Sequence, residues 1–396
     1  MVRQDDRVEP PKIITDGLVI RAWHPDDAAA VAKACQDPDI QRWTAVPVPY
    51  LREHADFFVG EFTTTSWRDG TRAPLGVFDE TTGDLVGASG LVKIDDGTAE
   101  IGYWTAPWAR RRGATTAATR AVARWAIEDL GVRRLAWRAE VGNHLSRLVA
   151  LRSGFTMEGI ARADIEDRDG TRRDAWVAAL LPGDTIDTTA AGPGSVEARR
   201  AVTFSRPQPD LFAATRNGEI RLRPLEDRDI DPIADSSNDP ETVRWTTVPH
   251  PYERVHAEDF VHTWGPRAWL RGTGAVFAIG EPETDAYAGL MELRLHPTNP
   301  ALADVGFVVP PHARGRGFAP AALSAVCAWA FTALRPHRIG WWANAGNEAS
   351  RRVATKAGFT IEGTNRGYLD HRGERVDAWT GALLASDGFA NGKAPA

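Results

Sequence analysis

The sequence has 396 residues, of which 43% are hydrophobic and 25% charged, and this ordinary composition excludes a wholly disordered or fibrous chain. At about 150 residues per domain, the length predicts two or three domains. The net charge of -6 argues against nucleic acid as a main partner. Two cysteines, Cys35 and Cys327, cannot build a disulfide framework and lack metal-ligand spacing, so we expect a cytoplasmic protein without a metal. No apolar stretch is long enough to predict a membrane span.

The chain contains one pattern twice. Residues 42–50 read RWTAVPVPY and residues 244–252 read RWTTVPHPY, so seven of the nine positions agree. Further matched blocks follow in the same order in both halves, among them GNHLSRLVALRSGFTMEG against GNEASRRVATKAGFTIEG and DAWVAAL against DAWTGAL. A period of about 200 residues is too long for a solenoid repeat and predicts two duplicated domains.

The domain boundaries follow from composition. We place domain one at residues 12–182 and domain two at residues 212–386. Between them, residues 183–211 are rich in Gly, Pro, Thr and Ala and show no helical or strand period, which is typical of a linker. Residues 387–396 are expected to form a flexible tail.

Each copy predicts an α+β unit, a mixed sheet with helices packed on it. In chain order the first copy predicts a strand with Ile20, a helix with an acidic first turn after His24, a loop rich in Trp and Pro at residues 42–50 (the Trp/Pro loop), and a further helix. Strands follow near residues 75–78, 85–92 and 100–104, and then a Gly/Arg turn and a long apolar helix over 116–130. The copy ends with a strand that has Leu135, Trp137 and Ala139 on one face, a short helix from Ser146 to Gly154, and two closing strands.

The Gly/Arg turn is a candidate anion site, because a turn between a strand and a helix presents free backbone N–H groups and the positive end of the helix dipole to one point. The turn comprises Arg110, Arg111, Arg112, Gly113, Ala114 and Thr115 in domain one, and Arg314, Gly315, Arg316, Gly317, Phe318 and Ala319 in domain two. Domain one has one glycine fewer. A basic surface turn or an RGG-like RNA-binding stretch is the alternative, but the recurrence of strand, turn and helix in both copies favours phosphate binding.

At these residues the sequence resembles the GNAT superfamily of acyl-CoA-dependent N-acyltransferases, whose signature is Gln/Arg-x-x-Gly-x-Gly/Ala. Domain two matches it through Arg314, Gly317 and Ala319, whereas domain one matches Arg110 and Gly113 but has Thr115 at the last position. Within the superfamily both copies look most like the RimJ/RimL branch. The motifs that carry this resemblance are TDGLVIR, the IGYW strand before the turn, the Asn-x-x-Ser element, the Gly-Phe after the following helix, and the late Asp-Ala-Trp strand.

The resemblance implies two tandem domains with mostly antiparallel sheets, and acetyl-CoA or another acyl-CoA as cosubstrate. It places the CoA pyrophosphate on the Arg/Gly turns and the pantetheine arm between two splayed strands. Asn143 and Asn347 would bind that arm, although a helix cap explains them equally well. The branch uses the serine of Asn-x-x-Ser as the acid that protonates the leaving thiolate, which implies this role for Ser146 and Ser350; capping of the helix is the structural alternative.

The general base is less well defined by the sequence. The acid that this branch carries after the Gly-Phe helix falls at Ile165 and Leu369, which cannot ionise. Other GNAT enzymes use a carboxylate on the fourth strand, where Glu100 and Asp304 stand. A carboxylate on a buried strand can have a raised pKa, but a partly solvated strand residue is an equal alternative.

The acceptor pocket is expected beside the Trp/Pro loop, where Trp43, Tyr50, Trp245 and Tyr252 could form an amphipathic wall or simply pack in the core. The leading hypothesis is an N-acetyltransferase acting on a peptide N-terminus or a small amine or antibiotic. Domain two could act alone, with domain one structural, or the reverse. An acyl-CoA sensor or partner-binding scaffold is the alternative from another class. A fused pair also predicts a monomer that reproduces a GNAT dimer within one chain, with a homodimer as the alternative.

Overall fold

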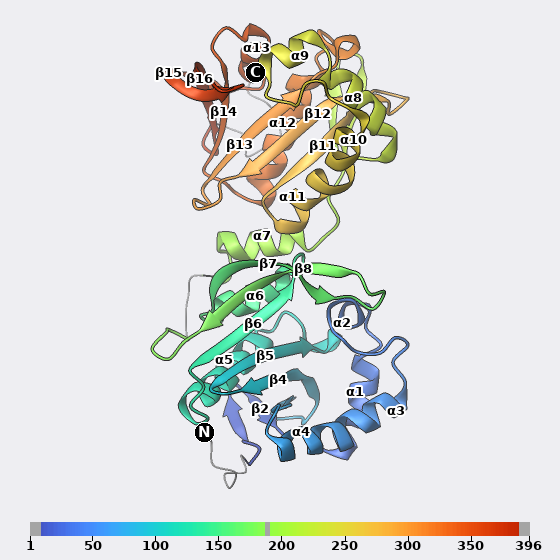
Figure 1. Ribbon diagram of the computed structural model, residues 1–396, viewed down its shortest axis with the longest axis vertical. Helices are drawn as coiled ribbons and strands as arrows, with labels where there is room; N and C mark the ends of the chain where they lie inside the picture. Colours follow the sequence, from blue (N-terminus) through green and yellow to red (C-terminus); the bar gives the residue numbers. More distant parts are fainter. Residues whose placement is uncertain (1–8, 187–190, 388–396) are drawn as a thin grey trace. The chain divides into compact units, whose positions relative to one another are not determined.

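The computed structural model describes residues 9–186 and 191–387 and divides into two compact units, Met1–Ala198 and Arg199–Ala396 (Figure 1). Each unit is an eight-stranded sheet with helices on both faces. This confirms the predicted α+β class and the duplication. Within the described residues, no helix is long and apolar enough to cross a membrane.

The first unit follows the predicted chain order, with short 3-10 or π turns labelled η. Its elements are β1 (Ile13–Thr15), β2 (Leu18–Arg21), η1 (Pro25–Asp27), α1 (Ala28–Ala34), α2 (Pro38–Trp43), α3 (Arg52–Phe57), η2 (Phe58–Phe62), α4 (Thr63–Asp69), β3 (Gly76–Asp79), β4 (Leu85–Asp95), β5 (Thr98–Thr105), η3 (Pro107–Ala109), α5 (Ala114–Glu128), β6 (Arg134–Glu140), α6 (His144–Arg152), β7 (Thr156–Glu166) and β8 (Arg172–Leu180). The strand order is β1-β2-β3-β4-β5-β6-β8-β7.

The second unit repeats this arrangement. Its elements are β9 (Leu211–Thr215), β10 (Gly218–Arg223), η4 (Asp227–Asp229), α8 (Ile230–Ser237), α9 (Pro240–Trp245), α10 (Arg254–Asp259), η5 (Phe260–Trp264), α11 (Gly265–Arg271), β11 (Gly274–Gly280), β12 (Tyr287–Leu295), β13 (Leu302–Val308), η6 (Pro311–Ala313), α12 (Phe318–Ala333), β14 (Arg338–Asn344), α13 (Glu348–Lys356), β15 (Thr360–His371) and β16 (Glu374–Leu384). Its strand order, β9-β10-β11-β12-β13-β14-β16-β15, is the same as in the first unit.

Two central strands of each sheet run parallel and part after a short paired stretch. β5 pairs with β6 over residues 98–100 and 134–136, and β13 pairs with β14 over 302–304 and 338–340, while the other pairings are antiparallel. Beyond these residues the two strands no longer share a ladder, although both continue. The splayed strands expected from the resemblance are therefore present in both units.

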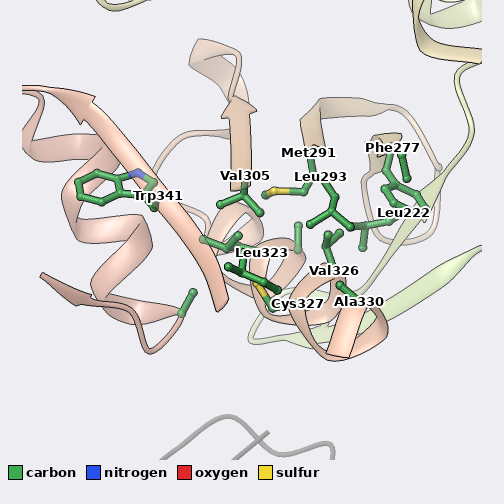
Figure 2. Packing of buried hydrophobic residues seen from close by; sticks show 14 of the residues in the cluster. Leu222, Phe277, Met291, Leu293, Val305, Leu323, Val326, Cys327, Ala330 and Trp341 are labelled. Carbon is green, nitrogen blue, oxygen red and sulfur yellow. The ribbon is translucent and has the colours of Figure 1, made fainter. Parts of the chain in front are cut away.

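The core of each unit lies between the sheet and its long central helix. In unit two, Met291, Leu293 and Val305 face α12, where Leu323 and Val326 meet them (Figure 2). The opposite face of the sheet is covered in part by a smaller cluster from α8 and α10. In unit one the expected face of β6 is confirmed, because Leu135, Trp137 and Ala139 are all buried.

The stretch expected to be an unstructured linker contains a helix, α7 (Val196–Phe204), inside which the boundary between the units falls. Ser195 caps it by accepting a hydrogen bond from the backbone N–H of Ala198. Ala198, Ala201 and Phe204 recur every three residues and are buried, a signal that the composition of the segment concealed. Residues 187–190 of the predicted linker and 388–396 of the predicted tail lie outside the described residues.

Candidate functional site

The two Arg/Gly turns have the backbone of an anion site. Gly113 and Gly317 have φ of 79° and 84° and directly precede α5 and α12. Neither helix has a side-chain cap among the described residues, so the backbone N–H groups of its first turn are free of intrahelical and capping partners. A Cβ added at either glycine would meet nothing within 4 Å, which shows open space above the turn. The turns can therefore receive a phosphate group.

Domain one keeps this backbone despite its missing glycine. Arg111 takes the place of Gly315 and adopts φ of 65°, against 75° for the glycine. A side chain in this left-handed region costs about 1 kcal/mol. The sequence difference therefore leaves the turn conformation unchanged but makes it less favourable in domain one.

The first arginine of each turn is held by a helix-capping carboxylate. Arg110 forms a bidentate ion pair with Asp37 and a further bond of 3.1 Å to Asp39, and Arg314 pairs with Asp239. Asp37 and Asp239 cap α2 and α9 by accepting backbone hydrogen bonds. These guanidinium groups thus anchor the turn to a neighbouring helix, and their side chains are not free for a ligand.

The remaining turn residues differ in exposure. Phe318 and Ala319 are buried in the core, so only their backbone N–H groups can face a ligand. Arg316 pairs with Glu281 and lies 4.5 Å from the Phe318 ring centroid. In domain one, Arg111 and Arg112 are exposed, Ala114 is half-buried, and the Thr115 hydroxyl forms a hydrogen bond with Thr105.

A second loop supports the turn in domain two. Arg216 and Asn217, between β9 and β10, donate hydrogen bonds of 2.9 Å to the backbone carbonyls of Gly315 and Arg316. The corresponding segment of domain one, Thr-Asp-Gly-Leu, places an acid and a glycine there. The Arg/Gly turn of domain two, which matches the GNAT signature at more positions, is thus held by Asp239 on one side and by Arg216 and Asn217 on the other.

The Asn-x-x-Ser elements open α6 and α13. Here the asparagine is the cap: Asn143 and Asn347 accept the backbone N–H of Ser146 and Ser350 at 3.2 and 3.1 Å. The capping role considered for the serines therefore belongs to the asparagines, and the serine hydroxyls stay available for other partners. Each asparagine keeps an amide N–H₂ group that can still reach a ligand.

The two serines differ in their partners. Ser350 Oγ accepts a hydrogen bond of 3.0 Å from Trp341 Nε1, which can only donate, so its own proton is free to point elsewhere. In domain one the hydroxyl of Tyr103 intervenes, donating to the backbone carbonyl of Ser146 at 2.8 Å and lying 3.4 Å from Ser146 Oγ. Burial raises the pKa of Tyr103 well above its ordinary value. Domain two has Phe307 at this position, so it has no intervening hydroxyl.

Both predicted bases are paired with an arginine. Glu100 accepts a hydrogen bond of 3.0 Å from Arg138 Nε, and Asp304 accepts one of 2.5 Å from Arg294 Nε. Burial raises the pKa of Asp304, and Arg294 opposes this effect. For Asp304 the guanidinium contact thus favours the ionised carboxylate, whereas burial disfavours it.

Comparison with known protein families identifies the family to which a chain with two such turns and two splayed sheets belongs. The sequence model of the acetyltransferase (GNAT) domain matches residues 17–156 and again residues 219–360. The chain belongs to the GNAT acetyltransferase family. It is an N-acetyltransferase with one GNAT domain in each half, as the sequence predicted.

Relatives of this GNAT protein match one half at a time. YdaF of Bacillus subtilis, named as a proposed ribosomal N-acetyltransferase, is 32% identical over 168 residues, which are 38% of this chain and 83% of YdaF. The L-amino acid N-acetyltransferase AaaT of Escherichia coli is 30% identical over 163 residues, 41% of this chain and 95% of AaaT. Among solved structures, RimJ of Mycobacterium smegmatis in complex with CoA-disulfide is 22% identical, covers 46% of this chain and 89% of its own, and has a TM-score of 0.42.

The Trp/Pro loops of the two GNAT domains divide the predicted acceptor residues into two kinds. Tyr50 and Tyr252 are buried in the helical layer, where each ring packs against a histidine. Trp43 and Trp245 are half-buried, with a guanidinium over each ring. Trp245 also lies beside Gly346, next to the Asn-x-x-Ser element. The tryptophans are thus better placed than the tyrosines to meet a ligand, and the acceptor wall stays a prediction.

In each GNAT domain an arginine of the closing hairpin binds backbone carbonyls in and beside the Trp/Pro loop, a contact that alignment of the two halves does not predict. The hairpin β7–β8 places Arg168 on the backbone carbonyls of Gln41, Thr44 and Val46. The hairpin β15–β16 places Arg372 on the carbonyls of Val243 and Val248 at 3.3 and 3.1 Å.

These two arginines do not occupy matched positions in the repeat, because one stands six residues before the shared Asp-Ala-Trp block and the other five. Folding brings each arginine to the Trp/Pro loop of its own domain.

Proposed function

We propose that the chain transfers an acetyl group from acetyl-CoA to a primary amine, and that domain two carries the more complete site. The observation that supports this best is the left-handed Gly317 turn at the uncapped start of α12, beside the opening between β13 and β14. Anion binding at such a helix end needs no side chain.

The residues of both turns fit CoA. Backbone N–H groups of residues 110–115 and 314–319 would hold the pyrophosphate, and the open space above Gly113 and Gly317 leaves room for it. The support that Arg216 and Asn217 give to the domain-two turn pre-organises it. We therefore expect tighter CoA binding in domain two than in domain one.

The chemistry needs an acid for the leaving sulfur and a proton acceptor for the amine. Acetyl-CoA supplies the activated acyl group. Ser350 is suited to donate a proton, because its Oγ accepts a hydrogen bond from Trp341 and its own proton is not used in that contact. In domain one, Ser146 would act through its contact with Tyr103. Asp304 and Glu100 are the carboxylates nearest to the turns along the chain. The amine forms the new C–N bond, the C–S bond breaks, and one proton passes to solvent.

The names of two relatives support two candidate classes of amine. A peptide or protein N-terminus corresponds to the ribosomal activity assigned to YdaF, and a free amino acid to that of AaaT. An acyl-CoA sensor or scaffold is the competing proposal, because the engaged arginines Arg110 and Arg314 and the paired carboxylates also suit a purely binding role.

Calorimetric titration of acetyl-CoA into the full chain tests the proposal. We compare the wild type with Gly113→Glu and Gly317→Glu, which put a carboxylate into each phosphate site. Gly131→Glu is the matched control, because Gly131 has φ of 68° and equally open surroundings but follows α5 instead of preceding it.

We expect a stoichiometry near two, with one site lost in each turn variant and none in the control. A folded wild type that does not bind acetyl-CoA would contradict the proposal. Binding without release of free CoA, over a panel of amino acids and peptides with free N-termini, would favour the sensor.

A further inference from the structure

Domain two contains a partly buried carboxylate that the repeat did not point to, Glu292 on β12. Its neighbours Met291 and Leu293 face α12 and are fully buried (Figure 2). Side chains alternate along a strand, so Glu292 lies on the opposite face of the sheet. Two residues earlier on that face, Leu290 packs against the small hydrophobic cluster from α8 and α10, and Val248 of the Trp/Pro loop packs against the same cluster. Glu292 therefore lies on the face of the sheet that carries the helical layer against which the Trp/Pro loop packs.

Glu292 is also beside the opening in the sheet. It pairs with Gly306 on β13, whereas the last residue of β13 still paired with β14 is Asp304, opposite Gly340. Gly306 is thus beyond the point where the two strands separate. Asp304, the base expected from the resemblance, lies at the closed end of the opening, and Glu292 lies at the open end.

The surroundings of Glu292 leave it able to take a proton. Its Oε2 accepts a hydrogen bond of 2.9 Å from Arg294 Nη1, and the same guanidinium binds Asp304 through Nε. One arginine therefore serves two carboxylates, which leaves one negative charge in the cluster. Among the described residues, Oε1 of Glu292 has no hydrogen-bond partner.

Burial raises the pKa of Glu292, Arg294 lowers it, and the charge of Asp304 raises it again. The side chain is 19% exposed, so the group is desolvated and still reachable.

Domain one has no such group. Gly90 pairs with Gly102 there, in the register that Glu292 and Gly306 occupy in domain two. Val92 takes the space over Gly102 that the Arg294 guanidinium takes over Gly306, since a Cβ at either glycine would lie within 3 Å of that side chain. At this register the same fold thus has a glycine and a valine in one copy, and a glutamate and an arginine in the other.

We propose that Glu292 is the general base of domain two, which accepts a proton from the protonated amine before the amine attacks. The proposal rests on the proposed acetyl transfer and assigns its proton acceptor. The ammonium group gives one proton to the Glu292 carboxylate and becomes a neutral amine, and its nitrogen then bonds to the thioester carbonyl carbon as the C–S bond breaks. The sulfur takes its proton from Ser350, and the second proton lost by the new amide nitrogen restores the Ser350 hydroxyl through solvent. Glu292 then releases its proton to solvent, so one proton is set free in each turnover. Domain one, with Gly90, lacks this base.

The test compares Glu292→Gln with the wild-type full chain. Glu362→Gln is the matched control, because Glu362 is also paired with an arginine, Arg338, on the same sheet but is itself exposed. We expect Glu292→Gln to lower kcat about 100-fold or more for the best amine of the panel, with the Kd for acetyl-CoA unchanged, and to abolish the acidic limb of the kcat/KM profile. Glu362→Gln should keep the wild-type rate and profile. An active wild type whose rate and acidic limb survive in Glu292→Gln would overturn the assignment and leave acetyl transfer standing.

A second measurement does not depend on turnover. In the full chain labelled with ¹³C at glutamate carboxyls, one resonance should titrate clearly above the others and be missing from Glu292→Gln. If every glutamate titrates in the ordinary range, the assignment fails even in an active enzyme. If no amine is acetylated but the resonance is present, the proposed function fails while the proton-accepting state of Glu292 is confirmed.

Discussion

At the scale of single residues, the matched serines at the start of α6 and α13 have different hydrogen-bond partners in the two copies. Trp341 donates directly to the hydroxyl of Ser350, whereas in domain one a tyrosine hydroxyl stands between the tryptophan strand and Ser146. The change of one residue, Tyr103 to Phe307, removes that hydroxyl. Two serines at matched positions in the repeat therefore have different hydrogen-bond partners: Ser146 donates to Tyr103, and Ser350 accepts from Trp341.

The substitution Trp341→Phe tests whether this hydrogen bond orients Ser350. Phenylalanine keeps an aromatic ring in the core but has no donor, so the serine proton is no longer directed away from the tryptophan. We expect kcat to fall about 10-fold, which corresponds to one hydrogen bond of about 1.4 kcal/mol, with little change in the Kd for acetyl-CoA. Trp329→Phe, in the same core on α12, controls for the loss of ring volume. Equal losses in the two variants would show a packing effect only.

At the scale of elements, an aspartate and an arginine join each Arg/Gly turn to the first helical layer. Asp239 caps α9 and binds Arg314 of the turn before α12, so one carboxylate joins two helix N-termini that are far apart in the sequence. Burial raises the pKa of Asp239, but hydrogen bonds from Arg314 and Thr242 outweigh burial, and the pKa ends below 3.8. The same arrangement holds in domain one through Asp37.

This lowered pKa predicts a pH-dependent contribution to stability. The folded state favours ionised Asp239 more than the unfolded chain does, so its stabilisation is complete above about pH 3.8 and is lost as the pH falls through the lower folded pKa. In urea unfolding, Asp239→Asn should be less stable than the wild type at pH 7, and this difference should shrink below pH 3.8. Asp231→Asn, an exposed carboxylate on α8, controls for the loss of one surface charge. A difference that stays constant down to pH 2 would contradict the prediction.

At the scale of the whole molecule, the chain has two separate cores. The main cluster of unit one ends at Ile186 and that of unit two begins at Phe204, so no residue belongs to both clusters. Each unit therefore has its own source of hydrophobic stabilisation. Whether the fused pair is a monomer stays a prediction.

Matched core substitutions test the independence of the two units. Leu135 and Leu323 are both fully buried, one in each main cluster. Each Leu→Ala change should cost about 2–5 kcal/mol within its own unit. Calorimetric scans should show Leu135→Ala lowering one transition and Leu323→Ala lowering the other. If both variants shifted the same transition by the same amount, the units would unfold as one.

Much of this fold could be predicted from the sequence alone, through the periodicity of apolar residues and the internal repeat. The duplication, the element order and the buried face of β6 all depend on residues close together in the chain, so local pattern was enough. The helix α7 was missed because the Gly/Pro/Thr composition around it masked a three-residue spacing of buried side chains. The sequence left open whether Asn or Ser caps α6 and α13, because both residue types are favourable helix caps, and the structure shows that the asparagines do so.

The sequence by itself determined that the chain is two copies of one α+β domain with an Arg/Gly turn before the long helix of each, because glycines and helix starts are properties of neighbouring residues. Only the tertiary structure decided which arginines are free, since Arg110 and Arg314 meet their aspartates across about 70 residues of chain. It also decided where Glu292 lies. A carboxylate acquires its chemistry from strand register, burial and the single guanidinium that it shares, and these are set by segments that meet only when the sheet forms.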